Sequence, residues 1–184
     1  MKRIIIVYLM LLFLTGCSYY ELDNIALAST INVNCTNEYC DIKIFFSNKN
    51  VKPLYVKGKT FKQMINKVRI KTPLNIEFNH LNSVIVNKDI DPKSYKEVLN
   101  YFNNKTNNFY VFISSNSDNT SVDQVYRKIK DKTLYKTSTY KDIKKTNSYI
   151  LGSTNLKDCY LVKDYKIVKH LTKKELIKIK KETK

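Results

Sequence analysis

The pattern of apolar and polar residues predicts two strands at the start of the folded chain and a capped helix after them. Residues 25–33 and 40–46 are rich in strand-forming residues, and the polar residues between them suit a hairpin turn. Residues 48–59 are polar and contain a proline and a glycine, so we expect a loop there. The next helix should begin at Thr60, because Thr60 and Gln63 have the spacing of a capping box.

Two apolar stripes predict helices that each bury one face. The stripes consist of Phe61, Met64, Ile65 and Val68, and then of Tyr95, Val98, Leu99 and Phe102. Residues at this spacing lie on one side of a helix, and core packing explains them better than a cofactor site does. The second helix has a strong start, with Asp91 as N-cap and Pro92 at the first helical position.

Strand-like runs separate these helices. Residues 74–86 alternate and then become apolar, which predicts a central strand, or two strands with a bend, with His80 inside the run. Residues 109–113 are wholly apolar and fit a buried strand, and a third helix is expected at residues 122–129. The alternation predicts an α+β domain over residues 17–130, with a mixed, mostly antiparallel sheet and helices packed on it.

The C-terminal part is predicted to be a small extension of that domain. Residues 131–154 lack periodicity, so we expect a weakly ordered connection there. Residues 155–184 predict a β-β-α unit that can pack on the same domain. It consists of a hairpin around residues 163–165 and a final helix that Thr172 and Glu175 cap as a second box.

The first 17 residues have the parts of a bacterial lipoprotein signal. A basic start at Lys2-Arg3 precedes an unbroken apolar run over residues 4–14, which is too short for a stable transmembrane span. Leu14-Thr15-Gly16-Cys17 resembles the lipobox, which implies cleavage after residue 16 and acylation of the Cys17 thiol. We therefore expect a lipid anchor on the extracytoplasmic face of the cell membrane. The alternatives are an ordinary secretory signal or an uncleaved anchor.

Charge narrows the choice of partners. The chain has a net charge of +17, and lysine supplies most of the excess. Only Arg69 and Arg127 follow the signal as arginines, in separate predicted helices, whereas a nucleic-acid interface would want arginines and aromatic residues on one face. No nucleic-acid partner is expected. Anionic lipid and wall polymers suit a tethered, lysine-rich domain, and the alternative is that the lysines only solvate the surface.

The cysteines predict structure and no metal chemistry. Cys35 and Cys40 would lie opposite each other in the first hairpin, where they can form a disulfide that contributes about 2 kcal/mol. The alternative is two thiols that cap a tight turn, because many Gram-positive exported proteins lack disulfides. Cys159 is then expected to be a buried thiol. The sequence has no CxxC, HExxH or cysteine–histidine cluster, so we expect neither a metal site nor a cofactor.

No catalytic constellation is visible in the sequence, so we expect the protein not to be an enzyme. A nucleophile with a base, or a pair of carboxylates, would be needed. His80 is expected in a buried or half-buried strand position, and His170 at the foot of the last hairpin is expected to be incidental. Glu77, Asp89 and Asp91 are close in sequence, but capping explains Asp91.

Several stretches together resemble the C-subunit lipoproteins of spore nutrient-germinant receptors, the Ger(x)C type. Gly16-Cys17 followed by residues 21–28 looks like the family's opening, in which the lipidated cysteine precedes a Glu-Leu and an apolar strand. A helix, Pro73 and residues 78–86, which include a His-Leu, follow in the family's order. Residues 160–175 are similar to its apolar strand, Lys-Asp turn, second strand and Leu-Thr-x-x-Glu.

The resemblance covers the N-terminal portion of a full subunit, and Ser18-Tyr19 replaces the usual Trp-Asp. It implies a non-catalytic accessory or truncated C-type subunit in spore germination, on the outer face of the spore inner membrane. Its partners would be integral-membrane receptor subunits, besides the lipid attached to Cys17. The alternative is a stand-alone surface lipoprotein that binds anionic wall polymer or lipid through its lysines. A solute-binding lipoprotein is disfavoured, because the chain is short for a two-lobed cleft.

Overall fold

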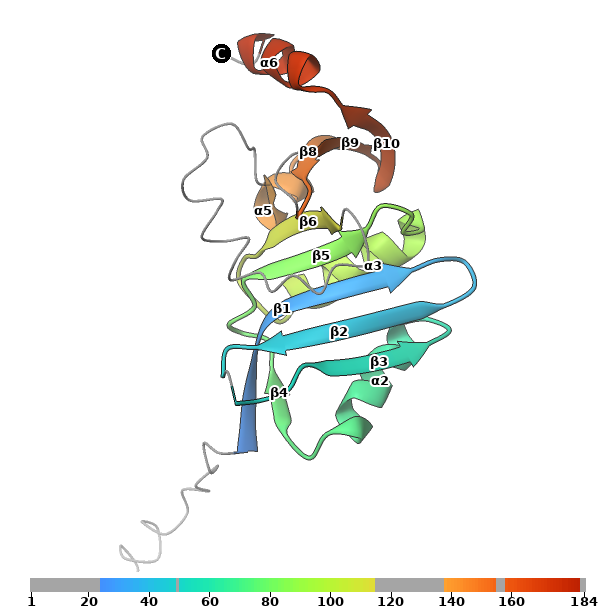
Figure 1. The fold of residues 1–184 in the computed structure, drawn as a ribbon, viewed down its shortest axis with the longest axis vertical. Coiled ribbons are helices and arrows are strands. Elements are labelled where there is room, and N and C mark those ends of the chain that lie inside the picture. Colours follow the sequence, from blue (N-terminus) through green and yellow to red (C-terminus); the bar gives the residue numbers. More distant parts are fainter. Residues whose placement is uncertain (1–23, 49, 115–137, 155–157, 183–184) are drawn as a thin grey trace, which may run out of the picture.

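The computed structural model describes residues 24–48, 50–114, 138–154 and 158–182, which form two sheets and their helices (Figure 1). The main sheet has the strand order β3-β2-β1-β5-β6-β7, with β4 beside β1, and the small sheet has the order β10-β9-β8. The strands are β1 (Ile25–Cys35), β2 (Cys40–Phe46), β3 (Leu54–Gly58), β4 (Asn75–Glu77), β5 (Ser83–Asn87), β6 (Tyr110–Ser114), β7 (Ser138–Thr139), β8 (Ser148–Gly152), β9 (Cys159–Lys163) and β10 (Lys166–Leu171). The helices are α2 (Phe61–Lys71), α3 (Pro92–Asn103), α5 (Tyr140–Lys144) and α6 (Lys173–Glu182).

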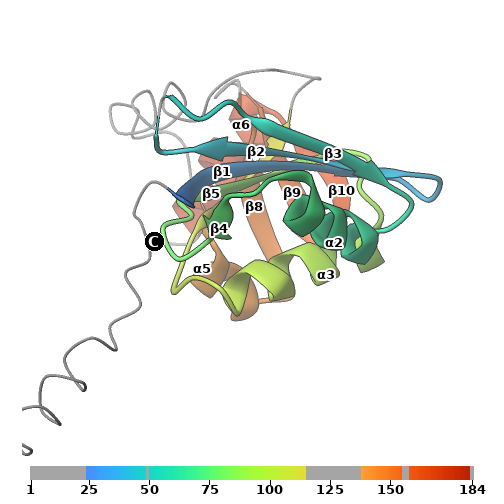
Figure 2. The same ribbon diagram turned by 90° about the horizontal axis from the view of Figure 1, so that it is seen from below.

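The predicted α+β class is confirmed. In the main sheet β1 is antiparallel to β2 and parallel to β5, and β5 is parallel to β6. Over the two sheets together, antiparallel pairs outnumber parallel pairs. The helices α2 and α3 lie on the same face of the main sheet (Figure 2). The core therefore forms between that face and the two helices.

A β-bulge at Ser29 keeps the long strand β1 in this core. The register with β2 shifts between Ala28 and Thr30, and the Ser29 hydroxyl donates to the Phe45 carbonyl at 3.2 Å. Before the bulge the buried residues of β1 are the even-numbered Ala26 and Ala28. After Thr30 the buried residues are odd-numbered, as at Ile31 and Val33. Because side chains alternate between the two faces of a strand, one extra residue is needed to keep both halves facing the helices.

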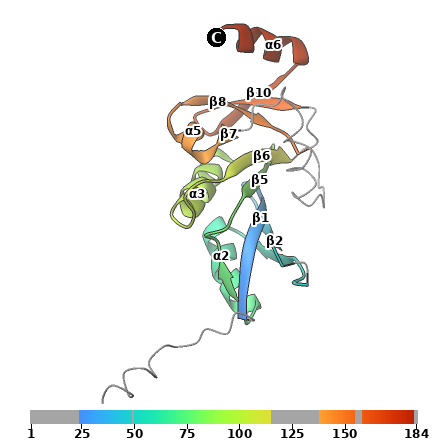
Figure 3. The same cartoon turned by 90° about the vertical axis from the view of Figure 1, so that its left-hand side faces the viewer.

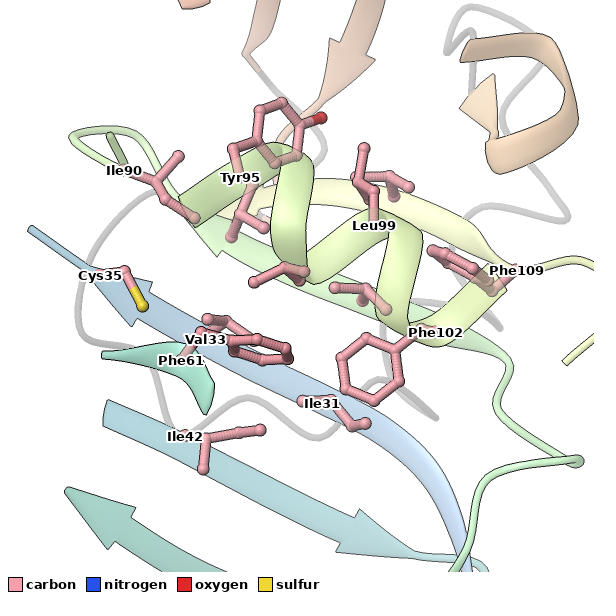
Figure 4. Packing of buried hydrophobic residues seen from close by; sticks show 14 of the residues in the cluster. Ile31, Val33, Cys35, Ile42, Phe61, Ile90, Tyr95, Leu99, Phe102 and Phe109 are labelled. Carbon is pink, nitrogen blue, oxygen red and sulfur yellow. The ribbon is translucent and has the colours of Figure 1, made fainter. Parts of the chain in front are cut away.

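Four aromatic rings link α2, α3 and the end of β4, and Figure 4 shows two of them, Phe61 and Phe102. Phe61 of α2 packs edge-on against Phe102 of α3, with ring centroids 5.9 Å apart. Phe78, directly after β4, lies 5.5 Å from the ring of Phe102, and Tyr101 lies 5.1 Å from it. Phe102 and Tyr101 each contact the other three rings, and of these two only Phe102 is completely buried.

The predictions for the helices α2 and α3 are confirmed in both stripes and caps. All eight stripe residues are buried. The Gln63 amide N–H donates to the Thr60 hydroxyl at 3.3 Å, and the Gln63 side-chain oxygen accepts from the Lys59 N–H. Asp91 accepts the Ser94 N–H at 2.9 Å, and Pro92 follows it as the first helical residue. These local hydrogen bonds fix where each helix begins.

The prediction of a loop over residues 48–59 is wrong for its second half, which forms the edge strand β3. Val56 of β3 is buried opposite Ile42 of β2, while Tyr55 is exposed. The strand is short, and Pro53 precedes it directly. A proline just before an edge strand does not remove any hydrogen bond from the sheet. Gly58 lets the strand approach α2, since a Cβ atom there would lie 3.1 Å from Cγ of Met64.

The expectation for His80 is also wrong. The run 74–86 splits into β4 and β5, which the sequence left open, and His80 is exposed in the turn between them. The Leu81 N–H donates to the Phe78 carbonyl across this turn, and the Asn82 N–H donates to Ser29 of β1. The bulge in β1 explains the split, because β4 pairs with the residues of β1 before the bulge and β5 pairs with those after it.

The range 131–154 contains regular elements where we expected a weakly ordered connection. Residues 138–152 include β7, α5 and β8, and Tyr140 stacks on Phe109 with ring centroids 5.3 Å apart. Two- and five-residue elements are too short to show periodicity in the sequence. The helix predicted at 122–129 lies outside the described residues.

The predicted C-terminal hairpin and helix are confirmed. A two-residue turn joins β9 to β10, and both of its residues have positive φ, 49° at Asp164 and 64° at Tyr165. The Thr172 N–H donates to Glu175 at 2.9 Å and the Glu175 N–H donates back to the Thr172 hydroxyl at 3.4 Å, which closes the predicted capping box. Val162 of β9 belongs to the same buried cluster as the helices α2 and α3.

A pair of buried tyrosines joins the small sheet to α3. The Tyr149 hydroxyl of β8 donates to the Tyr95 hydroxyl of α3 at 3.3 Å. Tyr165 packs edge-on against Tyr95 at 5.9 Å, so this contact helps to hold the positive φ that a tyrosine rarely adopts. Burial raises the pKa of the Tyr95 hydroxyl and of the Tyr149 hydroxyl well above the ordinary value.

We predict that the aromatic core stabilises the fold more than the Cys35–Cys40 disulfide does. Phe102→Ala should lower the free energy of unfolding by about 3–5 kcal/mol, because it leaves a cavity among three other rings. Reduction of the disulfide should lower it by about 2 kcal/mol, because the bond closes a short loop. Urea unfolding followed by circular dichroism, with and without a reductant, measures both. A substitution of the exposed Ile70 by Ala is the matched control, expected to change stability by less than about 0.5 kcal/mol.

We predict a loss of stability above about pH 10, where tyrosines of the unfolded chain ionise. The folded-state pKa of Tyr95 and of Tyr149 is raised, so each neutral hydroxyl contributes to the free energy of unfolding. This contribution is complete below the unfolded-state pKa, and it is lost as pH rises through the folded-state pKa. At neutral pH, Tyr149→Phe should lower the free energy of unfolding by about 1 kcal/mol. Adding Tyr95→Phe should lower it by less than Tyr95→Phe does in the wild-type chain, because the hydrogen bond is already lost. Urea unfolding between pH 7 and 11 tests both. Simple additivity of the two substitutions would contradict the contact.

Candidate functional site

The residue with the most specific predicted chemistry, Cys17, lies outside the described residues. The first strand that follows it in the chain, β1, begins at Ile25. Among the described residues there is no helix that is long and apolar enough to cross a bilayer.

The other cysteines are structural. Cys35 and Cys40 face each other at the end of the β1–β2 hairpin and form a disulfide, with their Cα atoms 4.1 Å apart. Both are buried, as is Cys159 at the start of β9. Since a reactive thiol needs access to its substrate, these positions fit a brace at the hairpin tip and core packing at Cys159.

The carboxylates Glu77 and Asp91 lie at opposite ends of β1. Glu77 pairs with Leu27 near the start of β1, whereas the Asp91 N–H donates to the Cys35 carbonyl at the other end of that strand. Eight residues of strand separate these points, about 26 Å. His170 lies 3.0 Å from Asp158, an exposed contact that ties β10 to the start of β9. No cluster of metal-ligating side chains occurs in the part of the chain that the structure describes.

A polar pocket of about 480 Å³ lies between α2, β4 and the end of α3. Apolar side chains line it together with the charged residues Arg69, Glu77 and Lys105. Glu77 accepts a hydrogen bond from Asn75 at 3.2 Å. Burial raises the pKa of the Tyr101 hydroxyl, and Arg69 beside it offsets part of that change. Its charged groups suit a small ligand that carries both charges. The lining contains no cysteine, histidine, serine or threonine, so it holds no serine or cysteine nucleophile and no histidine to act as its base.

A second hollow, which we call the basic groove, lies between the edge strand β3 and α2. It has a volume of about 500 Å³, and Tyr55, Val56 and Lys57 of β3 line it opposite Lys67, Ile70 and Lys71 of α2. The Lys67 ammonium group donates to the Lys57 carbonyl at 3.0 Å, and that of Lys71 donates to the Tyr55 carbonyl at 2.7 Å. These lysines occupy edge carbonyls of β3, which discourages another strand from pairing there.

Three lysines line this groove, Lys57, Lys67 and Lys71, and they belong to a basic stretch of the sequence. Residues 42–76 contain nine lysines and arginines and no aspartate or glutamate. Within the described residues, none of the four basic side chains of α2 is in a salt bridge. Lys57 is partly balanced, because it lies opposite Asp41 in the strand register. Burial raises the pKa of the Asp41 carboxyl, while Asn34 and Lys57 beside it oppose that rise. The helix side of the groove therefore keeps its positive charge.

An exposed apolar side chain, Ile70, lies among the lysines that line this groove. Ile70 is 85% exposed, the most exposed of the large hydrophobic residues described. Five residues after Ile65 and two after Val68, it falls on the side of α2 opposite the buried stripe. The role of Ile70, Lys67 and Lys71 was not predicted from the sequence. Two signals were present: an apolar residue outside the helical stripe, and a long run without acidic residues.

Comparisons with protein-family models, curated proteins and solved structures find no match to this chain.

Proposed function

We propose that the protein is a membrane-tethered, non-catalytic lipoprotein that acts as a C-type subunit of a spore nutrient-germinant receptor. The observation that carries the tether is the sequence Leu14-Thr15-Gly16-Cys17 after a basic start and an apolar run. Two or three acyl chains on Cys17 would suffice for lasting attachment, because each buried methylene contributes about 0.8 kcal/mol.

The receptor role is supported by the order of segments that resembles the Ger(x)C lipoproteins. The opening after Cys17, Pro73 after the first helix, and the hairpin and capped helix at the C-terminal end follow that order. The fold is compatible with docking: the described surface offers a polar pocket and a basic groove.

A second candidate function follows from the charge of the basic groove. A stand-alone surface lipoprotein could use the acid-free run 42–76 to bind an anionic wall polymer. Such binding should weaken steeply with salt, because the Debye length falls from about 10 Å at 0.1 M to about 3 Å at 1 M. Docking on integral-membrane subunits should survive moderate salt.

We predict that Cys17→Ala removes the anchor and slows germination. Without the thiol no acyl chain can be attached, so the mature domain should no longer partition as a lipoprotein. Detergent phase partitioning and mass spectrometry of the N-terminal peptide test the anchor, and loss of turbidity in nutrient-treated spores tests the function.

Ser18→Ala, next to the anchored cysteine, is the matched control and should behave as wild type. Unchanged germination in Cys17→Ala spores, together with no co-purification of receptor membrane subunits at moderate salt, would contradict the receptor role. Binding to purified wall polymer that disappears at high salt would favour the second candidate.

A further inference from the structure

The basic groove lies at the end of the domain where the chain enters from Cys17. Ile25, the first residue of β1, pairs with Asn75 of β4, only four residues after α2 ends at Lys71. Cys17 precedes Ile25 by eight residues, which can span at most about 28 Å. In Figures 1 and 3, α2 and the start of β1 lie toward one end of the long axis, and α6 lies at the other. An anchor at Cys17 would therefore keep α2 near the bilayer.

We propose that the outer face of α2 and the basic groove dock on the surface of an anionic phospholipid bilayer, with Ile70 inserted among the headgroups. This inference rests on the proposed lipid anchor at Cys17 but not on the receptor role. It adds an orientation to the tether: the end of the domain that carries α2 and the start of β1 turns toward the membrane, and the small sheet and α6 point away from it.

The charge of the surface selects the partner. Lys62, Lys67, Arg69 and Lys71 lie on α2, which has no acidic residue. Each basic side chain near an anionic membrane surface raises the binding constant about fivefold. The attraction decays over about 8 Å at physiological ionic strength, so it acts only on residues that the anchor holds close to the lipid.

The apolar and aromatic side chains of the groove fit the interfacial region of a bilayer. Ile70 is 85% exposed, and Tyr55 across the groove is 42% exposed. The Lys57 ammonium group lies 5.4 Å from the centre of the Tyr55 ring. Exposed apolar side chains within a ring of lysines are typical of helices that lie in the membrane interface, and tyrosine is favoured at that depth because its ring is amphipathic.

The other end of the molecule supplies a matched comparison. The helix α6 also carries lysines, including Lys173 and Lys174, and an exposed isoleucine, Ile177, at 42%. Composition alone would make α6 an equal candidate. Its position far from the start of β1 distinguishes the two helices (Figure 1).

The test places a fluorescent label on each helix of the acylated full chain in lipid vesicles. Asn66→Cys, on the exposed side of α2, leaves Ile70 and the lysines intact, and Ile177→Cys labels α6. The native Cys35 and Cys40 are joined in a disulfide and Cys159 is buried, and the parent chain without an added cysteine measures any background labelling. Quenching by lipids that carry a spin label in the upper acyl chain reports contact with the bilayer.

We predict strong quenching at position 66 and weak quenching at position 177 in vesicles of phosphatidylcholine with phosphatidylglycerol. In pure phosphatidylcholine the quenching at position 66 should fall toward the value at position 177. Lys67→Gln with Lys71→Gln removes two charges but keeps a hydrogen-bond donor near each carbonyl, and it should lower the docked-to-undocked ratio about fivefold per charge. Ile70→Ser should also weaken docking. Lys173→Gln with Lys174→Gln makes the same change of charge and should have no effect.

Each other outcome has a distinct meaning. Equal quenching at positions 66 and 177, with the chain still in the vesicles, would overturn the docking surface and leave the anchor intact. Equal quenching at position 66 in the neutral and anionic vesicles would overturn the role of charge. Binding of soluble wall polymer that displaces position 66 from the bilayer and ignores Ile70→Ser would assign the groove to the polymer. An unmodified Cys17 and a chain absent from the vesicles would overturn the anchor itself, and the docking proposal with it.

Discussion

The packing of α2 and α3 on one face of the main sheet is the constraint on which the rest of the structure depends. Phe102 joins the two helices to the turn after β4, because its ring contacts those of Phe61, Phe78 and Tyr101. Each large apolar side chain that is fully buried contributes about 1.5–3 kcal/mol. An exposed ion pair such as Lys169–Glu175 adds little, because water screens it, and the short loop closed by the Cys35–Cys40 disulfide contributes about 2 kcal/mol. The apolar faces therefore decide the fold, and the bulge at Ser29 exists to keep β1 in register with them.

The small sheet depends on the same core through a few specific contacts. Tyr149 reaches the Tyr95 hydroxyl, and Leu151 and Val162 belong to the buried cluster that also contains the helices. The Thr154 N–H donates to the Ile113 carbonyl, so the residues after β8 lie beside the end of β6. The C-terminal strands are thus attached to the main sheet by hydrogen bonds as well as by apolar packing. The strained turn residue Tyr165 is placed where its ring covers Tyr95.

Sequence patterns predicted the elements whose signals are local. The helices α2 and α3 have four-point stripes and complete caps within a dozen residues, and the hairpin β9–β10 has its turn between two apolar runs. The misses depend on residues far apart in the chain: β3 exists because β2 offers it a partner, and His80 lies in a turn because β1 bends at Ser29. The lipid-anchor motif is equally local and was visible. The basic groove was not, because it requires knowing which side of α2 faces β3.

The two faces of α2 are not independent. The stripe Phe61, Met64, Ile65 and Val68 fixes the rotation of the helix against the sheet, and this rotation alone turns Ile70 outward and brings Lys67 and Lys71 to the carbonyls of β3. A lysine already held by a carbonyl has less conformational entropy to lose when it meets a phosphate. A membrane-facing surface built in this way is preorganised by the core behind it. Its orientation would follow from the same apolar packing that folds the domain, with the anchor needed only to bring that surface within reach of the lipid.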